Sequence, residues 1–279
     1  FKLNAALMTA YDWEATNDNP TPQSIRGIDN FGGYDAVNRY GDENLRSTQN
    51  NYSTSIGDRR NFPGLDIYHR TGYWERDLVD YNTRSLKLNA AVHWRITDSL
   101  TLQYRYNVGS GTTVFQGDNR YALKDYVAQQ HTIELRAPKW YVQVYTNGED
   151  AGKSYDAVFT ALLLQNQRTS EYWWNTNYRE QYRFLAQQSG ILTGVPGYDN
   201  TPGDAVEPFL SQNPDVLRWL HTQARTYADG QTYDLTGQLL GQARLEPGTP
   251  EFTQQFQQVI SNPSFNSGGS RFISFSRFY

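Results

Sequence analysis

The segment from residue 85 to residue 111 alternates apolar and polar residues in two runs, with a short polar interruption between them. In the first run, residues 86–96, the even-numbered positions are apolar and the odd-numbered positions are mostly polar. The second run, residues 100–108, also keeps its apolar residues at even positions. A period of two places successive side chains on opposite faces of a strand. The segment therefore predicts a β-hairpin with one apolar face and one polar face.

The same period predicts further strands in the first half of the chain. Strands are expected at residues 2–13, from a start near 67 to 96, from 100 to about 115, at 121–136 and from 140 onward. Two of the connections, 97–99 and 137–139, are minimal turns, whereas residues 14–66 form a long loop. Short turns at one end of a sheet and long loops at the other are typical of bacterial outer-membrane barrels, in which the short turns are periplasmic.

The composition is polar on average but rich in aromatic residues. Of 279 residues, 38% are hydrophobic and 15% are aromatic, including 21 Tyr, and the mean hydropathy is −0.75. A transmembrane barrel accommodates such a composition, because only alternate strand residues face lipid and the interior is wet. The net charge of −4 is spread along the chain and excludes a nucleic-acid footprint. The absence of cysteine excludes disulfides and thiolate metal sites.

Two tryptophans support a membrane position for the apolar face. Trp94 and Trp140 each lie within three residues of a short turn, and each occupies a position on the apolar face of its strand. An interfacial aromatic girdle occupies this position in membrane barrels. An ordinary core position is the alternative for either residue taken alone.

The second half of the chain changes to helical periodicity. Apolar and aromatic residues recur every three or four positions in residues 170–187. Asn213, Pro214 and Gly230 are typical of helix boundaries, and Thr249 with the following Pro repeats the starting signal. Together with a predicted helix at 157–164, these signals indicate a helical block from about 155 to 265.

Signals for catalysis and for metal binding are lacking, so we expect no enzyme activity, no catalytic residues, no metal site and no cofactor. The four His have no metal-ligand spacing, and no nucleophile or phosphate-binding motif is present. The aromatic residues Tyr172, Trp173 and Trp219 are the best candidates for ligand binding. The helical spacing of Trp174, Tyr178 and Tyr182 places Trp174 in the helix core, and helix geometry then turns Trp173 about 100° away, toward an exposed position. Packing of Trp173 against neighbouring loops is an equally weighted alternative.

Several segments, in this order, resemble TonB-dependent outer-membrane receptors of the Bacteroidota type. The first are KLNAALMTAYDWEATN, YDAVNRYGDE and the long stretch from RTGYWERDLVDYN to FQGDNRYALKD. QQHTIELRAPKWYVQVYTNGEDAGKSYD, HTQARTYADG and LEPGTPEF follow. The likeness covers nearly the whole chain, and the order of the segments carries more weight than any one of them.

The resemblance implies a β-barrel of about 22 strands, with an N-terminal plug and energy supplied by TonB. It implies uptake of a scarce nutrient such as a metal chelate, a glycan or a peptide. The chain lacks a plug, a TonB-contacting segment and enough strands to close a barrel, and it begins within a strand, so we expect it to be a fragment. The expected partners are outer-membrane lipid, the rest of the barrel and plug, TonB through that plug, and a surface lipoprotein or other members of an outer-membrane complex.

The predicted fold is therefore mainly β: about five antiparallel strands of a transmembrane barrel with a long helical extracellular insertion. Residues 1–154 are assigned to the barrel strands with the loop 14–66, residues 155–270 to the insertion, and residues 271–279 to the start of the next strand. Residues 166–270 are expected outside the cell. The residues expected to face lipid are Leu86, Leu88, Val92, Trp94, Ile96, Leu100, Leu102 and Tyr104. Those expected to face the lumen are Lys87, Asn89, His93, Arg95, Gln103 and Arg105.

Two other functions remain open from the sequence. A soluble β-rich carbohydrate-binding or hydrolase domain would explain the aromatic residues, but not the short turns at one end. An outer-membrane adhesin or assembly component would share the barrel and lack transport.

Overall fold

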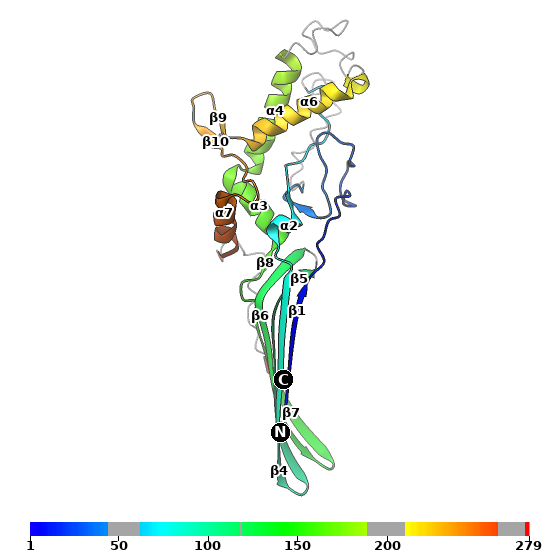
Figure 1. Ribbon diagram of the computed structural model, residues 1–279, viewed down its shortest axis with the longest axis vertical. Helices are drawn as coiled ribbons and strands as arrows, with labels where there is room; N and C mark the ends of the chain where they lie inside the picture. Colours follow the sequence, from blue (N-terminus) through cyan, green and yellow to red (C-terminus); the bar gives the residue numbers. More distant parts are fainter. Residues whose placement is uncertain (44–61, 118, 189–209, 262–276, 279) are drawn as a thin grey trace. The chain divides into compact units, whose positions relative to one another are not determined.

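A computed structural model describes residues 1–43, 62–117, 119–188, 210–261 and 277–278 (Figure 1). The predicted loop 14–66, insertion 155–270 and terminal segment 271–279 each contain residues outside these ranges. Of the described residues, 39% are in strands and 29% in helices, and the strand pairs in its sheets are antiparallel, which confirms a mainly β fold. No closed barrel is found within the described residues.

The chain divides into two compact units, which are described separately. The sheet unit comprises residues 1–15, 78–160 and 255–279, and the helical unit comprises residues 16–77 and 161–254.

The sheet unit is built on long antiparallel strands in the order β1-β4-β5-β6-β7-β11, with β8 paired to β6. These strands are β1 (Lys2–Tyr11), β4 (Asn82–Thr97), β5 (Leu100–Gln116), β6 (Arg120–Ala137), β7 (Trp140–Asp150), β8 (Tyr155–Asp156) and β11 (Arg277–Phe278). The predicted turns at 97–99 and 137–139 lie at the same end of the sheet (Figure 1). β11 pairs with β7 in the segment where the start of a further strand was expected.

One carboxylate ties three strands together at the opposite end of the sheet. Asp12, directly after β1, accepts hydrogen bonds from the hydroxyls of Thr83 (2.6 Å) and Thr113 (3.0 Å) and from the backbone N–H of Val114 (3.2 Å). Because the donors come from β4 and β5, the side chain fixes the ends of β1, β4 and β5 relative to one another.

The helical unit combines helices with short strand pairs. The remaining elements are β2 (Arg39–Tyr40), β3 (Tyr73–Trp74), α2 (Glu75–Leu78), α3 (Ala157–Arg168), α4 (Glu171–Gln188), α6 (Pro214–Asp229), β9 (Thr232–Tyr233), β10 (Leu239–Gly241) and α7 (Pro250–Ser261). Of these, α2, α3 and α7 begin in one unit and end in the other.

The core of the helical unit is aromatic and follows the predicted helical spacing. Trp174, Tyr178 and Tyr182, which recur every four residues along α4, are all fully buried. The ring of Tyr178 stacks on Tyr68 with 4.2 Å between centroids. Trp174 is buried as predicted, and its indole N–H donates to the carboxylate of Asp229 at 2.8 Å.

Residues 16–77 belong to the helical unit, whereas the sequence analysis had grouped the loop 14–66 and a strand starting near residue 67 with the sheet. The predicted start of that strand was wrong, because residues 67–72 form no strand and Leu65 and Tyr68, spaced three apart, are buried in one cluster with residues of α4 and α6. Their apolar surface is removed from water by helices rather than by a strand, and β4 begins only at Asn82.

The predicted helix starts are confirmed in position, but one predicted cap does not form. Pro214 and Pro250 each occupy the first helical position, and the Thr249 hydroxyl accepts the N–H of Phe252 at 3.2 Å. Asn213 occupies the N-cap position of α6 without a side-chain capping hydrogen bond. Its ψ of 66° departs from the extended conformation in which a cap side chain reaches back to the helix.

We predict that the helical unit loses stability in mild acid through His221, whose ring is buried beside the Tyr178 hydroxyl at 2.8 Å. Burial lowers the pKa of His221 to about 4. In the unfolded state the pKa of the His221 side chain is near 6.5. Between about pH 6.5 and pH 4, the unfolded state therefore binds a proton at this histidine and the folded state does not. The free energy of unfolding falls as the pH drops from about 6.5 to about 4, by up to about 3 kcal/mol.

Urea unfolding followed by helical circular dichroism at several pH values measures this loss. His221→Asn should flatten the profile relative to the wild type, and His93→Asn, at an exposed strand position, should leave it unchanged. Parallel profiles for wild type and His221→Asn would contradict the prediction.

Candidate functional site

The two faces of the sheet have the reverse of the usual burial. On the apolar face, Val92 is 55% exposed and Trp94 is 64% exposed. On the polar face, Thr132 is 3% exposed and Glu134 is 7% exposed. A sheet that covers a protein core buries its apolar face and exposes its polar face. On β6 this sheet shelters polar side chains, although Lys87, His93 and Arg95 on the same face are exposed, and on the opposite face it leaves apolar side chains uncovered.

The strand register places the predicted residues on two opposite faces. Pairs such as Leu88–Val108, Val92–Tyr104 and Trp94–Leu102 put the apolar sets of β4 and β5 together. A register shift between Arg95 and Thr97 interrupts the alternation at Ile96. Apolar side chains exposed on this face are Leu3, Leu7, Leu86, Leu88, Val92, Trp94, Tyr104, Ile133, Trp140, Val142 and Val144. The predicted residues Leu100 and Leu102 are half-buried on the same face.

The two turn-proximal tryptophans are exposed on the apolar face. Trp94 on β4 is opposite Leu102 on β5, and Leu102 is opposite Leu135 on β6. Leu135 is in turn opposite Val142 on β7. Trp140 lies two residues before Val142 on β7, next to the turn. Among the described residues neither tryptophan packs into a core, since Trp94 is 64% exposed and Trp140 is 51% exposed.

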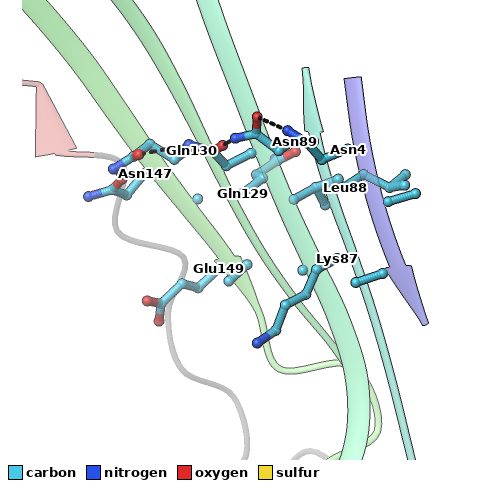
Figure 2. A pocket seen from close by; sticks show the side chains of 15 residues that line it. Asn4, Lys87, Leu88, Asn89, Gln129, Gln130, Asn147 and Glu149 are labelled. Carbon is cyan, nitrogen blue, oxygen red and sulfur yellow. Dashed lines mark hydrogen bonds between the residues drawn. The ribbon is translucent and has the colours of Figure 1, made fainter. Parts of the chain in front are cut away.

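The polar face carries a row of side-chain amides that crosses five strands (Figure 2). Its members are Asn4, Asn89, Asn107, Gln130 and Asn147, which are directly opposite one another in the register. Asn4 donates to Asn89 (3.4 Å), Asn89 to Asn107, Asn107 to Gln130 (3.2 Å) and Gln130 to Asn147 (2.9 Å). Each of the three inner amides uses one donor and one acceptor in the row, whereas Asn4 only donates and Asn147 only accepts, so at least one N–H and further lone pairs remain on each member.

The neighbouring row on the same face forms a hollow. It runs Ala6, Lys87, Gly109, Ala128 and Glu149 across the same five strands. Because the central residues are small, a cavity of about 530 Å³ lies between Lys87 and Glu149, beside the amide row (Figure 2). Ligand pockets have volumes of about 300–1,000 Å³.

A second polar cluster lies nearer the short turns. Glu134 accepts a hydrogen bond from Nε of Arg136 at 2.7 Å and lies 3.8 Å from a guanidinium nitrogen of Arg105. Arg105 was predicted to face the lumen, and its pairing with Glu134 neutralises part of the charge on this face. Lys87, Asn89, His93, Arg95 and Gln103 share the face with Arg105.

The three predicted ligand-binding aromatics are exposed, and they lie on two different helices. Tyr172 and Trp173, at the start of α4, meet edge to face with 5.0 Å between ring centroids. Trp219, on α6, is also exposed. The role of all three in binding stays a prediction.

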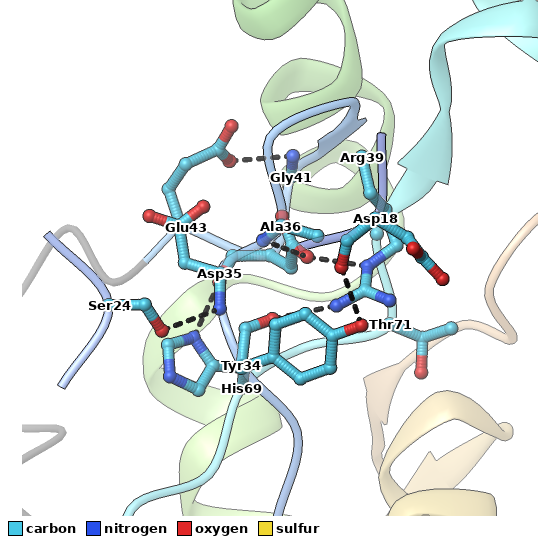
Figure 3. A network of polar contacts seen from close by, with 12 residues as sticks. Asp18, Ser24, Tyr34, Asp35, Ala36, Arg39, Gly41, Glu43, His69 and Thr71 are labelled. Carbon is cyan, nitrogen blue, oxygen red and sulfur yellow. Dashed lines mark hydrogen bonds and ion pairs between the residues drawn. The ribbon is translucent and has the colours of Figure 1, made fainter. Parts of the chain in front are cut away.

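The helical unit contains a polar network built on two adjacent carboxylates, the buried Asp42 and the half-buried Glu43 (Figure 3). Asp42 accepts from Nε of Arg39 at 2.6 Å, and Glu43 accepts from the N–H of Gly41 at 2.6 Å. Nδ1 of His69 lies 2.8 Å from the Asp42 backbone carbonyl. Burial raises the pKa of Asp42 to about 7 and that of Glu43 to about 8, and the neighbouring carboxylate adds to the rise at Glu43.

In the part of the chain that the structure describes, no group of three or more His, Asp or Glu side chains is placed to hold a metal ion. No helix in that part is both long and apolar enough to cross a membrane. Comparisons with family models, curated proteins and solved structures find no match to this chain. Function is therefore inferred from the geometry.

Sequence reasoning missed the amide row. In the sequence alone, Asn and Gln at the polar positions of a strand cannot be distinguished from ordinary solvent-facing residues, because the strand register is not known. The signal was present as one amide in each of five strands, but it becomes a row only when strands far apart in sequence are aligned.

We predict that the amide row stabilises the sheet. Asn107→Leu leaves Asn89 and Gln130 without their central partner, so the free energy of unfolding should fall by about 1–3 kcal/mol. Gln103→Leu is the matched control, because Gln103 lies on the same strand and face and has no side-chain partner among the described residues. Denaturant unfolding in detergent measures both variants. Equal losses would show that the row adds nothing beyond polarity.

Proposed function

We propose that this chain forms part of the wall of an outer-membrane β-barrel in a TonB-dependent receptor that takes up a scarce nutrient. The observation that carries the proposal is the reversed burial of the sheet. Apolar side chains such as Val92 and Trp94 are left uncovered, whereas Thr132 and Glu134 on the polar face are sheltered. Lipid on one side and a wet interior on the other satisfy this arrangement, and bulk water on both sides does not.

The strand lengths support a membrane position. β4, β5 and β6 contain 16, 17 and 18 residues. A tilted strand crosses a bilayer with about 9–11 residues. Each of the three is therefore long enough to cross the bilayer and to continue into the water beyond it.

The edges of the sheet support a larger assembly. In the described part of the chain, β1 pairs on one side only, with β4. An unpaired strand edge in hydrocarbon leaves backbone N–H and C=O groups without partners, which costs several kcal/mol for each group. Further strands of the same barrel would supply these partners, and β11 already extends the sheet beyond β7.

The topology follows from the connections. The short turns at 97–99 and 137–139 are assigned to the periplasm, and the helical unit to the outside of the cell. Ligand then meets the helical unit first, where Tyr172, Trp173 and Trp219 offer exposed rings. The hollow between Lys87 and Glu149 on the lumen face provides a later polar contact.

We predict that an arginine substitution lowers the stability of the protein in the membrane on the apolar face of β4 but has little effect on the polar face. Val92→Arg should lower the free energy of unfolding in the membrane by about 2–4 kcal/mol, because it places a charge in hydrocarbon. His93→Arg is the matched control at the next position, with its side chain on the wet face. Folded fractions in lipid vesicles across a denaturant series measure both. If both variants are tolerated equally in a detergent-free, monodisperse protein, the sheet belongs to a soluble domain instead.

A second prediction concerns orientation. Gly237 lies in an exposed turn between β9 and β10, and a side chain there would meet no neighbouring atom. An epitope inserted at Gly237 should be labelled on intact cells, whereas one inserted at Asp98 should be labelled only after the outer membrane is permeabilised. The reverse result would show that the strands run in the opposite direction.

A further inference from the structure

The helical unit contains a second pocket, of about 520 Å³, whose lining is rich in arginine. Four guanidinium groups contribute to it: Arg39, Arg70, Arg225 and Arg244. Two carboxylates, Asp77 and Glu246, also line it. The arginines come from four segments that are distant in sequence, so the fold and not local sequence brings the charges together.

Backbone carbonyls hold these arginines in place. Arg70 donates to the carbonyl of Thr169 at 3.0 Å, and Arg225 donates to that of Gly32 at 2.6 Å. Arg244 donates to the carbonyl of Gly72 at 2.9 Å and also to that of Thr71 at 3.0 Å. A carbonyl orients a guanidinium group but does not neutralise its charge.

Two of the four charges have a carboxylate partner. Arg39 pairs with Asp42 at 2.6 Å, and Arg244 pairs with Glu246 at 2.9 Å.

The other two, Arg70 and Arg225, have no carboxylate within ion-pair distance among the residues that the structure describes. The nearby Asp229 accepts instead from the hydroxyl of Thr71 and the indole of Trp174. Nε of Arg225 is buried and has no hydrogen-bond partner among the described residues. Burial also lowers the pKa of Arg70 to about 10.

Such an arrangement is costly without an anion, because a desolvated charge needs a partner to offset the loss of water. Guanidinium groups present paired N–H donors whose spacing matches carboxylate and phosphate oxygens. Aromatic residues complete the lining: Tyr34 and Trp74 lie under the guanidinium of Arg39, at 4.9 and 5.6 Å from their ring centroids. Figure 3 shows Tyr34 and Arg39 within the neighbouring polar network.

We propose that this pocket binds a small organic anion with two or more carboxylate or phosphate groups. Arg225 and Arg70 bind the anionic groups, and the organic portion contacts the ring of Trp74. The volume accommodates a ligand of ordinary small-molecule size. The assignment does not depend on the membrane location proposed above, since every contact lies within the helical unit.

The first test compares arginine variants of the full polypeptide, purified in detergent, using citrate and inorganic phosphate as probes. Both probes are titrated by calorimetry against a chloride background of equal ionic strength. Arg225→Met should weaken binding at least about 10-fold, the loss expected for a charge-assisted hydrogen bond. Arg183→Met removes the same charge from an exposed position on α4, where Arg183 pairs with Glu180, and should leave affinity unchanged.

A second variant changes affinity in the opposite direction and guards against misfolding of the first. Glu246 is largely exposed and competes for Arg244. Glu246→Gln removes this competing carboxylate and should tighten citrate binding about three-fold at low salt, consistent with a partly screened charge. Glu180→Gln is its control and should have no effect.

The outcomes separate the possibilities. Citrate binding that exceeds phosphate binding identifies a polycarboxylate ligand, and the reverse order identifies a phosphate ester; either result supports the proposal. Binding of the neutral triethyl ester of citrate with the same affinity as citrate would overturn the proposal. Failure of both citrate and inorganic phosphate to bind would also overturn it. Unchanged affinity in both Arg225→Met and Glu246→Gln would also overturn it. Failure of the face-specific arginine test on β4, with anion binding intact, would refute only the membrane proposal.

Discussion

The antiparallel register of the five long strands is the constraint on which the sheet unit depends. Register decides which side chains share a face and which lie in one row, and a slip of one residue would exchange the two faces. The amide row needs Asn4, Asn89, Asn107, Gln130 and Asn147 all in line. The ion pair between Glu134 on β6 and Arg105 on β5 needs the same alignment. Polar contacts on the sheltered face therefore reinforce the register that creates them.

The stability of the helical unit depends on a different feature, the burial of large aromatic side chains that carry hydroxyl groups. Burying a tyrosine stabilises the unit only if its hydroxyl keeps a hydrogen-bond partner. Tyr178 has His221 as its partner, and Tyr182 donates to the carbonyl of Pro63 at 2.7 Å. Because Pro63 and the buried Tyr68 lie between β1 and β4 in sequence and yet contact α4, residues 62–77 are as much a part of this core as α4 and α6.

The sequence predicted elements well where one periodicity extended over many residues. The strands from Asn82 to Asp150 and the helix faces of Trp174 and Tyr178 are local patterns, so they can be identified without knowledge of the fold. The boundary of the helical unit could not be found in this way, because Leu65 and Tyr68 reveal their packing partner only after the chain folds. The same applies to the amide row and to the arginine pocket. Each joins residues with no common local pattern, and neither Asn107 nor Arg225 differs in sequence context from a surface residue.

The exposed aromatics and the arginine pocket represent two ways in which this chain could recognise a ligand, and the structure favours the second as a built site. Tyr172 and Trp219 offer exposed apolar area on two different helices, and within the described part of the chain their side chains make no charged contact that would orient a ligand. Arg70 and Arg225 are already held by backbone carbonyls, so binding an anion requires little further ordering of these side chains. Preorganisation of this kind has a cost without an anion, since a half-buried charge that lacks an ion-pair partner lowers stability. An anion that offsets this cost stabilises the folded unit as it binds, which couples recognition to the stability of the helical unit itself.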